Sequence, residues 1–278
     1  MKDILNLKEL LDMALVEDLG NNGDVTAEAI FKDETCSFSL VSKDEGIICG
    51  IEIFKMVMAR VDEKIKVKSF YSDGDAIHKG NIAASLAGPV VSILKGERTA
   101  LNFLSHLSAI ATKTFLFVKE ADGKTKILDT RKTMPGYRGL HKYAVRCGGG
   151  TNHRMGLYDM VMIKDNHADA AGGILPAVQK IRAKWGSRYK IEVEARNFDE
   201  VKEALDCGAD IIMLDNMTDD EMSEAVKYIA KRAKTEASGN MSFERIAGAA
   251  STGVTYISFG ELTHTVKAFD FSLKKNPL

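Results

Sequence analysis

Residues 189–217, YKIEVEARNFDEVKEALDCGADIIMLDNM, contain the repeating unit that decides the fold. Apolar runs at 189–193 and 211–214 predict two strands, and the helical spacing at 198–207 predicts a helix between them. This order is typical of parallel strands joined by a crossover helix. The same rhythm predicts strands at 126–128, 160–163, 234–236 and 255–258, and helices at 139–147, 173–185, 219–231 and 242–249. A run of about six such units favours a closed α/β barrel over an open doubly wound sheet.

Polar residues directly follow these predicted strands. They are Arg131 with Lys132, Lys164, Glu194, Asp215, Ser238 with Gly239, and Gly260. A single charged residue in this position is usually a loop residue. In an α/β barrel, however, the carboxyl ends of the strands form the catalytic mouth, and the whole set is therefore predicted to share one cavity.

The composition of that cavity indicates a phosphorylated ligand. Glu194 and Asp215 are hard oxygen ligands, which suits Mg²⁺ brought in on a phosphate group. The alternative is that they pair with Lys164 and nearby Arg residues. Ser238, Gly239 and Gly260 follow the last two strands, where barrels commonly bind phosphate. We therefore expect a phosphorylated sugar.

The segment 129–167 is locally basic, with four Arg residues, three Lys residues and three Asp residues. A solvated surface would explain such a run. Glycines within it, including Gly148-Gly149-Gly150, instead allow the backbone to approach a ligand, and Arg matches carboxylate or phosphate geometry. Anion binding is the favoured interpretation.

The whole chain has 278 residues, is 45% hydrophobic and 28% charged, and carries a net charge of -1. This near-neutral balance argues against a nucleic-acid binder. The first twenty residues lack the apolar core of a signal peptide, and no window is expected to cross a membrane. The four cysteines are far apart without a CxxC pair, which suits reduced thiols in a cytoplasm.

The N-terminal part has a different pattern, with more strands. Strands are expected at 35–41, 47–48, 65–70 and 82–86, and helices at 5–16, 51–61 and 95–121. Asp24 is expected to cap a short helix. These elements predict a small α/β sheet followed by a long helix that bridges two domains.

Ten short motifs carry a family resemblance. They are GDVT at 23–26, ERTALNFLS at 97–105, SAIAT at 108–112, DTRKTMPGYR at 129–138, GGGTNHR at 148–154, IKDNH at 163–167, EVEA at 192–195, IMLDNM at 212–217, EASG at 236–239 and SFGELTHT at 258–265. In this order they resemble the quinolinate phosphoribosyltransferase family over nearly the whole chain.

The resemblance implies an N-terminal α/β sandwich domain at 1–108, to which a strand within 266–278 returns, and an incomplete TIM-like α/β barrel at 109–265. It also implies transfer of a phosphoribosyl group from phosphoribosyl pyrophosphate to quinolinate, with decarboxylation, in NAD synthesis. The expected cofactor is Mg²⁺, and the expected partner is a second copy in a homodimer with shared active sites, or a hexamer.

The resemblance assigns roles to individual residues. Arg131, His153, Arg154 and Lys164 would hold the carboxylates of quinolinate, and Arg98 would come from the partner subunit. Lys132 would lie near pyrophosphate or substrate, and Glu194 and Asp215 near the ribose and Mg²⁺. Ser238, Gly239 and Gly260 would bind the 5-phosphate, and His264 is a further substrate-binding candidate.

Three positions depart from the common family pattern: Ala109, Asn240 and Thr265. They put local loop geometry in question. The alternatives that remain are a paralogue associated with molybdate transport genes, a nicotinate phosphoribosyltransferase, a Schiff-base aldolase that uses Lys164, and a non-catalytic binding protein.

Overall fold

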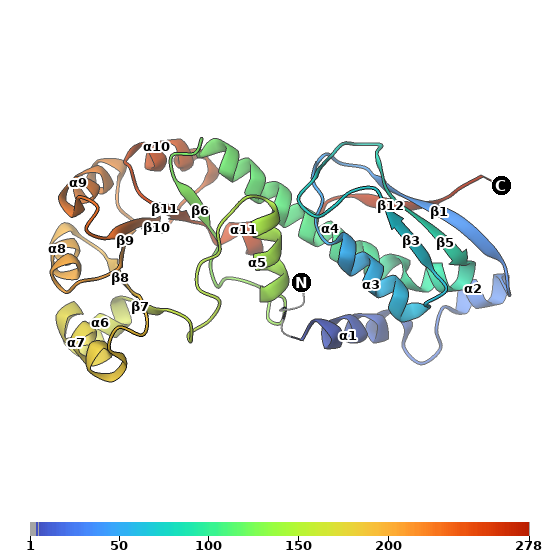
Figure 1. Cartoon of the computed structure of the whole chain (residues 1–278), viewed down its shortest axis with the longest axis horizontal. Coiled ribbons are helices and arrows are strands. Elements are labelled where there is room, and N and C mark those ends of the chain that lie inside the picture. The colour runs from blue at the N-terminus through green and yellow to red at the C-terminus, as the bar shows by residue number, and fades with distance from the viewer. Residues whose placement is uncertain (1–3, 5, 278) are drawn as a thin grey trace. The chain divides into compact units, whose positions relative to one another are not determined.

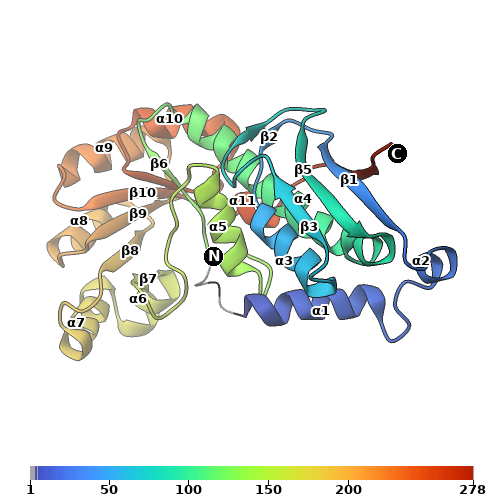
Figure 2. The same cartoon turned by 45° about the vertical axis from the view of Figure 1, so that its right-hand side comes forward.

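The structure is a computed structural model that describes residue 4 and residues 6–277. It contains two compact units. The first comprises the described parts of 1–115, 134–149 and 262–278, and the second comprises 116–133 and 150–261. Figures 1 and 2 show the helices and strands of both units.

The second unit is built on a six-stranded sheet in the order β6-β11-β10-β9-β8-β7. Its strands are β6 (Lys126–Leu128), β7 (Val161–Ile163), β8 (Ile191–Ala195), β9 (Ile211–Asp215), β10 (Lys234–Ser238) and β11 (Tyr256–Ser258). All five pairings between them are parallel. Because β6 and β7 are the two edges of this sheet, the barrel stays open, as predicted from the resemblance.

Helices follow the strands and cover the sheet on its outer side (Figure 1). They are α6 (Asp165–Ala171), α7 (Ile174–Trp185), α8 (Phe198–Asp206), α9 (Asp219–Ile229) and α10 (Ile246–Ser251), with a short 3-10 helix η1 (Phe243–Arg245). Helix α6 was not predicted, because its polar sequence DNHADAA lacks the apolar spacing of the other helices. The α/β fold class is confirmed, and all six predicted strands of this unit are present.

The strands of the second unit end at one edge. In the register of the sheet, Ala195 lies beside Leu214, and Asp215 lies beside Ser238. Ser258 in turn lies beside Leu128, the last residue of β6. The residues that follow these strands therefore meet at one rim, as parallel topology requires.

The first unit contains a four-stranded antiparallel sheet in the order β12-β1-β5-β3. These strands are β12 (Phe271–Lys275), β1 (Thr35–Ser42), β5 (Ile82–Pro89) and β3 (Lys66–Ser69), and β2 (Gly46–Ile47) pairs separately with β4 (Ala76–Ile77). The last strand of the chain thus pairs with the first, as the resemblance implied.

Helices of the first unit are α1 (Leu7–Leu19), α2 (Val25–Ile30), α3 (Ile51–Val61) and α5 (Arg138–Cys147). The predicted start of α1 at Leu5 lies outside the described residues, and its end is three residues later than expected. Asp24 caps α2 as predicted, since its carboxylate accepts from the backbone N–H groups of Thr26 and Ala27.

The division into units differs from the predicted boundaries at 108 and 265. Helix α5 belongs to the first unit, where the Tyr143 hydroxyl donates to Asp73 at 2.7 Å and the Tyr137 ring stacks on Phe103. Long helix α4 (Val90–Glu120) contains the boundary between Phe115 and Leu116, and short helix α11 (Glu261–His264) contains the other.

Helix α4 also corrects one expectation about membranes. By length and composition it is long and apolar enough to cross a bilayer, although 56% of its most apolar window is buried inside the protein. A core helix of a globular protein meets the same criteria, so this feature is weak evidence for a span.

Candidate active site

The rim of the second unit, meaning the residues that follow β6 to β11, carries an ion pair between Lys164 and Glu194. The Lys164 Nζ atom lies 2.7 Å from Glu194 Oε2, and the Glu194 side chain is 9% exposed whereas that of Lys164 is 47% exposed. Lys164 is the N-cap of α6, and its backbone N–H donates to the His167 ring at 3.1 Å. The IKDNH motif therefore fixes the backbone from which Lys164 reaches the rim.

Asp215, at the end of β9, is the second carboxylate of the rim. Burial raises its pKa, and the negative charge of Glu194 raises it further, while a hydrogen bond from Asn216 Nδ2 at 2.7 Å opposes the shift. Two carboxylates that repel each other at a half-buried site are stabilised by a cation. Glu194 and Asp215 therefore fit Mg²⁺ bound through oxygen ligands.

The rim next to Asp215 has a tight backbone at Gly239. This glycine has φ of +79°, and a Cβ atom there would lie 2.4 Å from Asn216 Oδ1. Asn240 follows in a left-handed conformation with φ of +46°, and its Nδ2 donates to Asn216 Oδ1 at 2.9 Å. Asn tolerates this conformation better than other side chains do, so the departure from Gly at 240 keeps the turn.

The other two departures are also accommodated. Ala109 is buried in α4 of the first unit. Thr265 places its hydroxyl 2.7 Å from Nδ1 of exposed His264. Within the second unit, the rim hydroxyls of Ser238 and Ser258 are 3.3 Å apart, which places two small polar groups where β10 and β11 end.

Two guanidinium groups, those of Arg131 and Arg154, lie near each other in the second unit. Burial lowers the pKa of Arg154, and the charge of Arg131 lowers it further, while Glu192 acts in the opposite direction. The Arg154 guanidinium is held by the Met160 carbonyl at 3.3 Å. Arg131 Nε is buried and has no hydrogen-bond partner in the part of the chain that the structure describes. Close, incompletely paired cations are suited to an anionic ligand.

Asp129 holds this cationic segment against the sheet. Its fully buried carboxylate accepts from the backbone N–H of His153 at 2.9 Å and from the Asn152 side chain. Thr151 bridges to Leu128 of β6. These contacts fix residues 151–154 beside the end of β6, and Lys132 follows that strand with its backbone N–H bonded to Thr130 Oγ1.

A second polar cluster, here called the floor, consists of His153, Glu192 and Glu236. His153 Nε2 lies 3.1 Å from Glu192 Oε2 and 3.4 Å from Glu236 Oε2. The exposed fractions of these side chains are 7%, 0% and 1%. One ligand atom from each residue lies within 4.8 Å of the other two, so the floor could also hold a metal ion.

Protons in the floor are shared between its members. Burial opposes the charged imidazole, but the two carboxylates outweigh it and raise the pKa of His153 to about 10. Burial and the charge of Glu236 raise the pKa of Glu192 to about 7. Because His153 Nδ1 accepts the Arg154 N–H at 2.7 Å, the ring itself carries one proton, at Nε2, and the further proton that the floor retains lies on a carboxylate.

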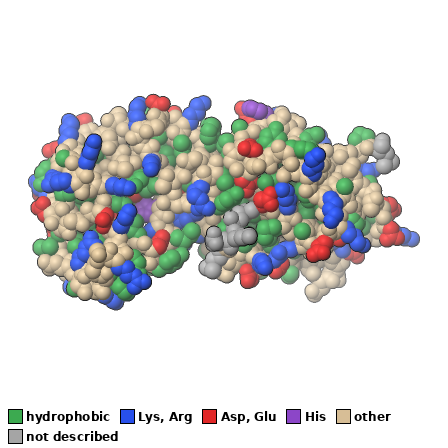
Figure 3. Space-filling view, viewed as in Figure 1, with side chains coloured by type: hydrophobic (Ala, Val, Ile, Leu, Met, Phe, Trp, Pro, Cys, Tyr) green, Lys and Arg blue, Asp and Glu red, His purple; other side chains and the backbone are tan. Residues whose placement is uncertain are grey.

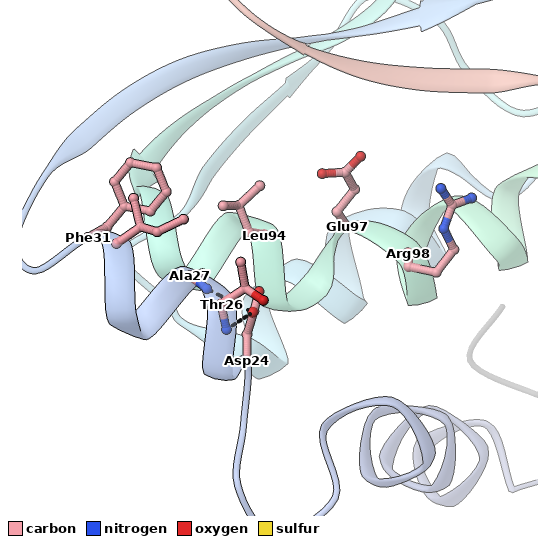
Figure 4. Close-up of a pocket in the computed structure, with 8 residues that line it drawn as sticks. Asp24, Thr26, Ala27, Phe31, Leu94, Glu97 and Arg98 are labelled. Atoms are coloured by element: carbon pink, nitrogen blue, oxygen red, sulfur yellow. Dashed lines mark hydrogen bonds between the residues drawn. The ribbon is translucent and has the colours of Figure 1, made fainter.

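Arg98 and His264 belong to the first unit. Arg98 is exposed on α4 and lines a pocket of about 330 Å³ together with Glu97, Leu94 and the start of α2 (Figure 4). Among the described residues no hydrogen bond or ion pair of its guanidinium is found. Burial raises the pKa of the neighbouring Glu97, and the charge of Arg98 acts against that rise.

The surface around the sheet of the second unit carries both signs of charge. In Figure 3, the left-hand part of the visible face carries Lys and Arg side chains, and Asp and Glu side chains lie between them. On this face the positive side chains are not gathered into one extended basic stripe.

The structure brings most of the predicted residues together in the second unit. They are Arg131, Lys132, His153, Arg154, Lys164, Glu194, Asp215, Ser238, Gly239 and Gly260. Four residues that hold the predicted site residues in place were not predicted from the sequence: Asp129, Asn216, Glu192 and Glu236. Alternation could have found the two floor carboxylates, because Glu192 and Glu236 stand two residues before Glu194 and Ser238 on the same strands.

An open parallel barrel with cations and carboxylates at its strand ends defines a class of α/β-barrel proteins that bind anionic ligands. Models of the quinolinate phosphoribosyl transferase N-terminal and C-terminal domains match residues 24–108 and 110–274. The chain belongs to the quinolinate phosphoribosyltransferase family.

Individual relatives agree with this membership. The chain is 46% identical over 270 residues to a probable nicotinate-nucleotide pyrophosphorylase (carboxylating) of Bacillus subtilis, covering 97% of this chain and 93% of the relative. It is 45% identical to a decarboxylating quinolinate phosphoribosyltransferase of Nicotiana tabacum, covering 97% and 82%. The solved nicotinate-nucleotide pyrophosphorylase of Francisella tularensis superposes with a TM-score of 0.94 at 41% identity, covering 97% and 96%.

Proposed function

We propose that this protein transfers the phosphoribosyl group of phosphoribosyl pyrophosphate to quinolinate, in NAD biosynthesis. The products are nicotinate mononucleotide, pyrophosphate and carbon dioxide. Relatives with this activity in their names match nearly the full length of the chain. The observation that carries the proposal is the rim itself, where a cationic pair, Lys164 and two carboxylates meet at the carboxyl ends of one sheet.

Quinolinate is a dianion, so a pocket that desolvates it needs several fixed cations. Arg131, Arg154 and Lys164 supply them, and an Arg fork matches a carboxylate with two parallel hydrogen bonds. Lys164 is paired with Glu194. A bound carboxylate would share this ammonium group with Glu194.

Bond formation joins the ring nitrogen of quinolinate to C1 of the ribose as pyrophosphate leaves. Positive charge develops on the ribose, and Glu194 and Asp215 are the carboxylates that stabilise it. Once the nitrogen carries the ribose, the pyridinium ring accepts the electron pair released when the 2-carboxylate departs as carbon dioxide. Carbon 2 then takes a proton, which completes nicotinate mononucleotide.

The remaining rim residues bind phosphate groups. Ser238, Gly239 and Gly260 hold the 5-phosphate, and Lys132 lies toward the pyrophosphate. When bound at Glu194 and Asp215, Mg²⁺ supplies positive charge to the leaving pyrophosphate. We place His264 among the substrate-binding residues as the resemblance implies.

The working form in this proposal is a homodimer, or a hexamer of such dimers, in the cytoplasm. Arg98 is exposed and its guanidinium has no partner within the described residues, as expected of a side chain lent to a second copy. Mixing inactive Arg98→Ala and Asp215→Asn variants tests this. Recovered activity in the mixture supports shared sites, and a mixture as inactive as its parts contradicts them.

The activity is tested by incubating the protein with Mg²⁺, phosphoribosyl pyrophosphate and either quinolinate or nicotinate. Carbon dioxide and nicotinate mononucleotide are expected from quinolinate, and a chelator is expected to stop the reaction. Product from nicotinate instead would reassign the substrate. Product from neither would favour the paralogue that acts on another acceptor.

A further inference from the structure

The floor lies on the same strands as the rim but deeper in the sheet. Glu192 precedes Glu194 by two residues on β8, and Glu236 precedes Ser238 by two residues on β10. Since side chains alternate along a strand, each pair projects from one face. The floor is therefore part of the same face that forms the rim, one layer further down.

Both ring nitrogens of His153 face protein groups. Nδ1 accepts the backbone N–H of Arg154 at 2.7 Å. Nε2 faces the carboxylates of Glu192 and Glu236 at 3.1 and 3.4 Å. With a side chain that is 7% exposed, the ring offers little surface to a ligand.

Burial of two carboxylates is costly unless partners compensate them. Apart from the contacts with His153 and the contact between the two carboxylates themselves, the oxygens of Glu192 and Glu236 have no hydrogen-bond partner in the described part of the chain. Such an arrangement fixes the ring, because a rotation of His153 would take the Nε2 donor away from both buried carboxylates at once.

The floor is connected to the cationic pair in two ways. The ring of His153 holds the main chain of Arg154 through the hydrogen bond to its N–H. The charge of Glu192 also acts on the Arg154 guanidinium, against the repulsion from Arg131. The floor is therefore bonded to the main chain of Arg154 and lies close enough to its guanidinium to act on its charge.

We propose that Glu192 and Glu236 clamp His153 as a positioning residue, which sets Arg154 against Arg131 for the carboxylates of quinolinate. His153 itself does not contact the substrate, in contrast to the role implied by the resemblance. This inference rests on the proposed function, because it names how that site is held.

The kinetic test compares Glu192→Gln and Glu236→Gln with Glu203→Gln, a carboxylate of α8 that accepts from the Leu175 N–H. We expect the quinolinate KM to rise about tenfold in the two floor variants, the size of one lost hydrogen bond. The KM for phosphoribosyl pyrophosphate and kcat should be unchanged, as should all constants of Glu203→Gln. Equal losses in every constant would indicate a general structural defect and overturn the proposal.

A second measurement does not depend on turnover. In ¹⁵N-histidine-labelled protein, the His153 signals are assigned by their loss in His153→Gln, and quinolinate is added. We expect the ring signals to shift in Glu192→Gln but to keep their values when quinolinate binds. A large shift of the ring nitrogens of the wild type on quinolinate binding would show direct contact and overturn the proposal.

The two measurements also separate this inference from the proposed function. A wild type that makes no product from quinolinate refutes the function, and the ring signals of Glu192→Gln still report whether the clamp exists. Elemental analysis of protein purified without chelator tests the alternative that His153, Glu192 and Glu236 bind a metal ion. A stoichiometric divalent ion that is lost in both floor variants would make the floor a metal site instead of a clamp.

Discussion

The rim and the floor of the second unit use the same chemical groups at two depths of one sheet. On the rim, Glu194 pairs with a Lys side chain that is 47% exposed. On the floor, two residues earlier on the same strand, Glu192 is fully buried against His153. The depth of a side chain determines its role. Water or substrate can replace the ion-pair partner of a rim residue, whereas the buried partner of a floor residue stays in place. The rim is suited to ligands and the floor to holding the groups that bind them.

The largest expected effect is on the rim. Arg131→Ala should weaken quinolinate binding by roughly a thousandfold, because a desolvated carboxylate loses its charged partner. Steady-state kinetics and calorimetry measure this, with Lys202→Ala on α8 as a control that leaves both unchanged. Normal saturation by quinolinate in Arg131→Ala would remove that residue from the site.

The floor should matter more for stability than the rim does. In His153→Ala, Glu192 and Glu236 are left buried without their partner, which should lower the free energy of unfolding by about 3 kcal/mol. Lys164→Ala breaks a half-exposed pair and should cost less than about 1 kcal/mol. Urea denaturation of both variants checks the order, and equal losses would erase the distinction between the two layers.

The rim carboxylates should affect turnover more than binding. Glu194→Gln and Asp215→Asn should each lower kcat by about a hundredfold if they stabilise charge in the transition state. The KM for quinolinate should change much less. Single-turnover experiments measure this, and an unchanged kcat would reduce both residues to ion-pair partners.

A buried histidine without carboxylates provides a contrast with the floor. His141 of the first unit is fully buried, with Nε2 2.9 Å from His106 Nε2, and burial, then His106, lowers its pKa to about 4. Its pKa in the unfolded chain is higher, about 6.5, so between these values the unfolded state binds more protons. Stability should therefore rise by about 2 kcal/mol from pH 4 to 6.5. In His141→Leu, the free energy of unfolding should not show this rise between pH 4 and 6.5. The same pH dependence in wild type and variant would contradict the lowered pKa of His141.

A small effect on stability is expected at the phosphate end of the rim. Gly239→Ala should lower the free energy of unfolding by about 1 kcal/mol, because its φ is +79° and Asn216 occupies the space of a Cβ. Asn240→Gly should change stability by less than that, although it removes a hydrogen bond to Asn216. Thermal denaturation compares them, and a Gly239→Ala protein as stable as wild type would refute the steric argument.

Sequence reasoning found the rim because topology exposes it. Lys164, Glu194 and Asp215 follow apolar runs, and parallel strands bring their carboxyl ends to one edge whatever the side-chain packing. The floor was not predicted, because alternation places Glu192 and Glu236 on the same face as Glu194 and Ser238 but does not show that this face is buried. Glu192 and Glu236 stand within short β runs, where a solvated strand face would have the same letters.

The sequence by itself determined the class of fold, the succession of strands and helices along the chain, and the family, because periodicity and many spaced motifs are local properties of the chain. It also placed Asp24 as a helix cap and marked the strand-end residues. Only the tertiary structure decided that helix α5 joins the first unit, that Asn240 keeps the turn at Gly239, and that His153 faces two buried carboxylates. These outcomes depend on contacts between residues far apart in the chain, whose distances and burial no local pattern fixes.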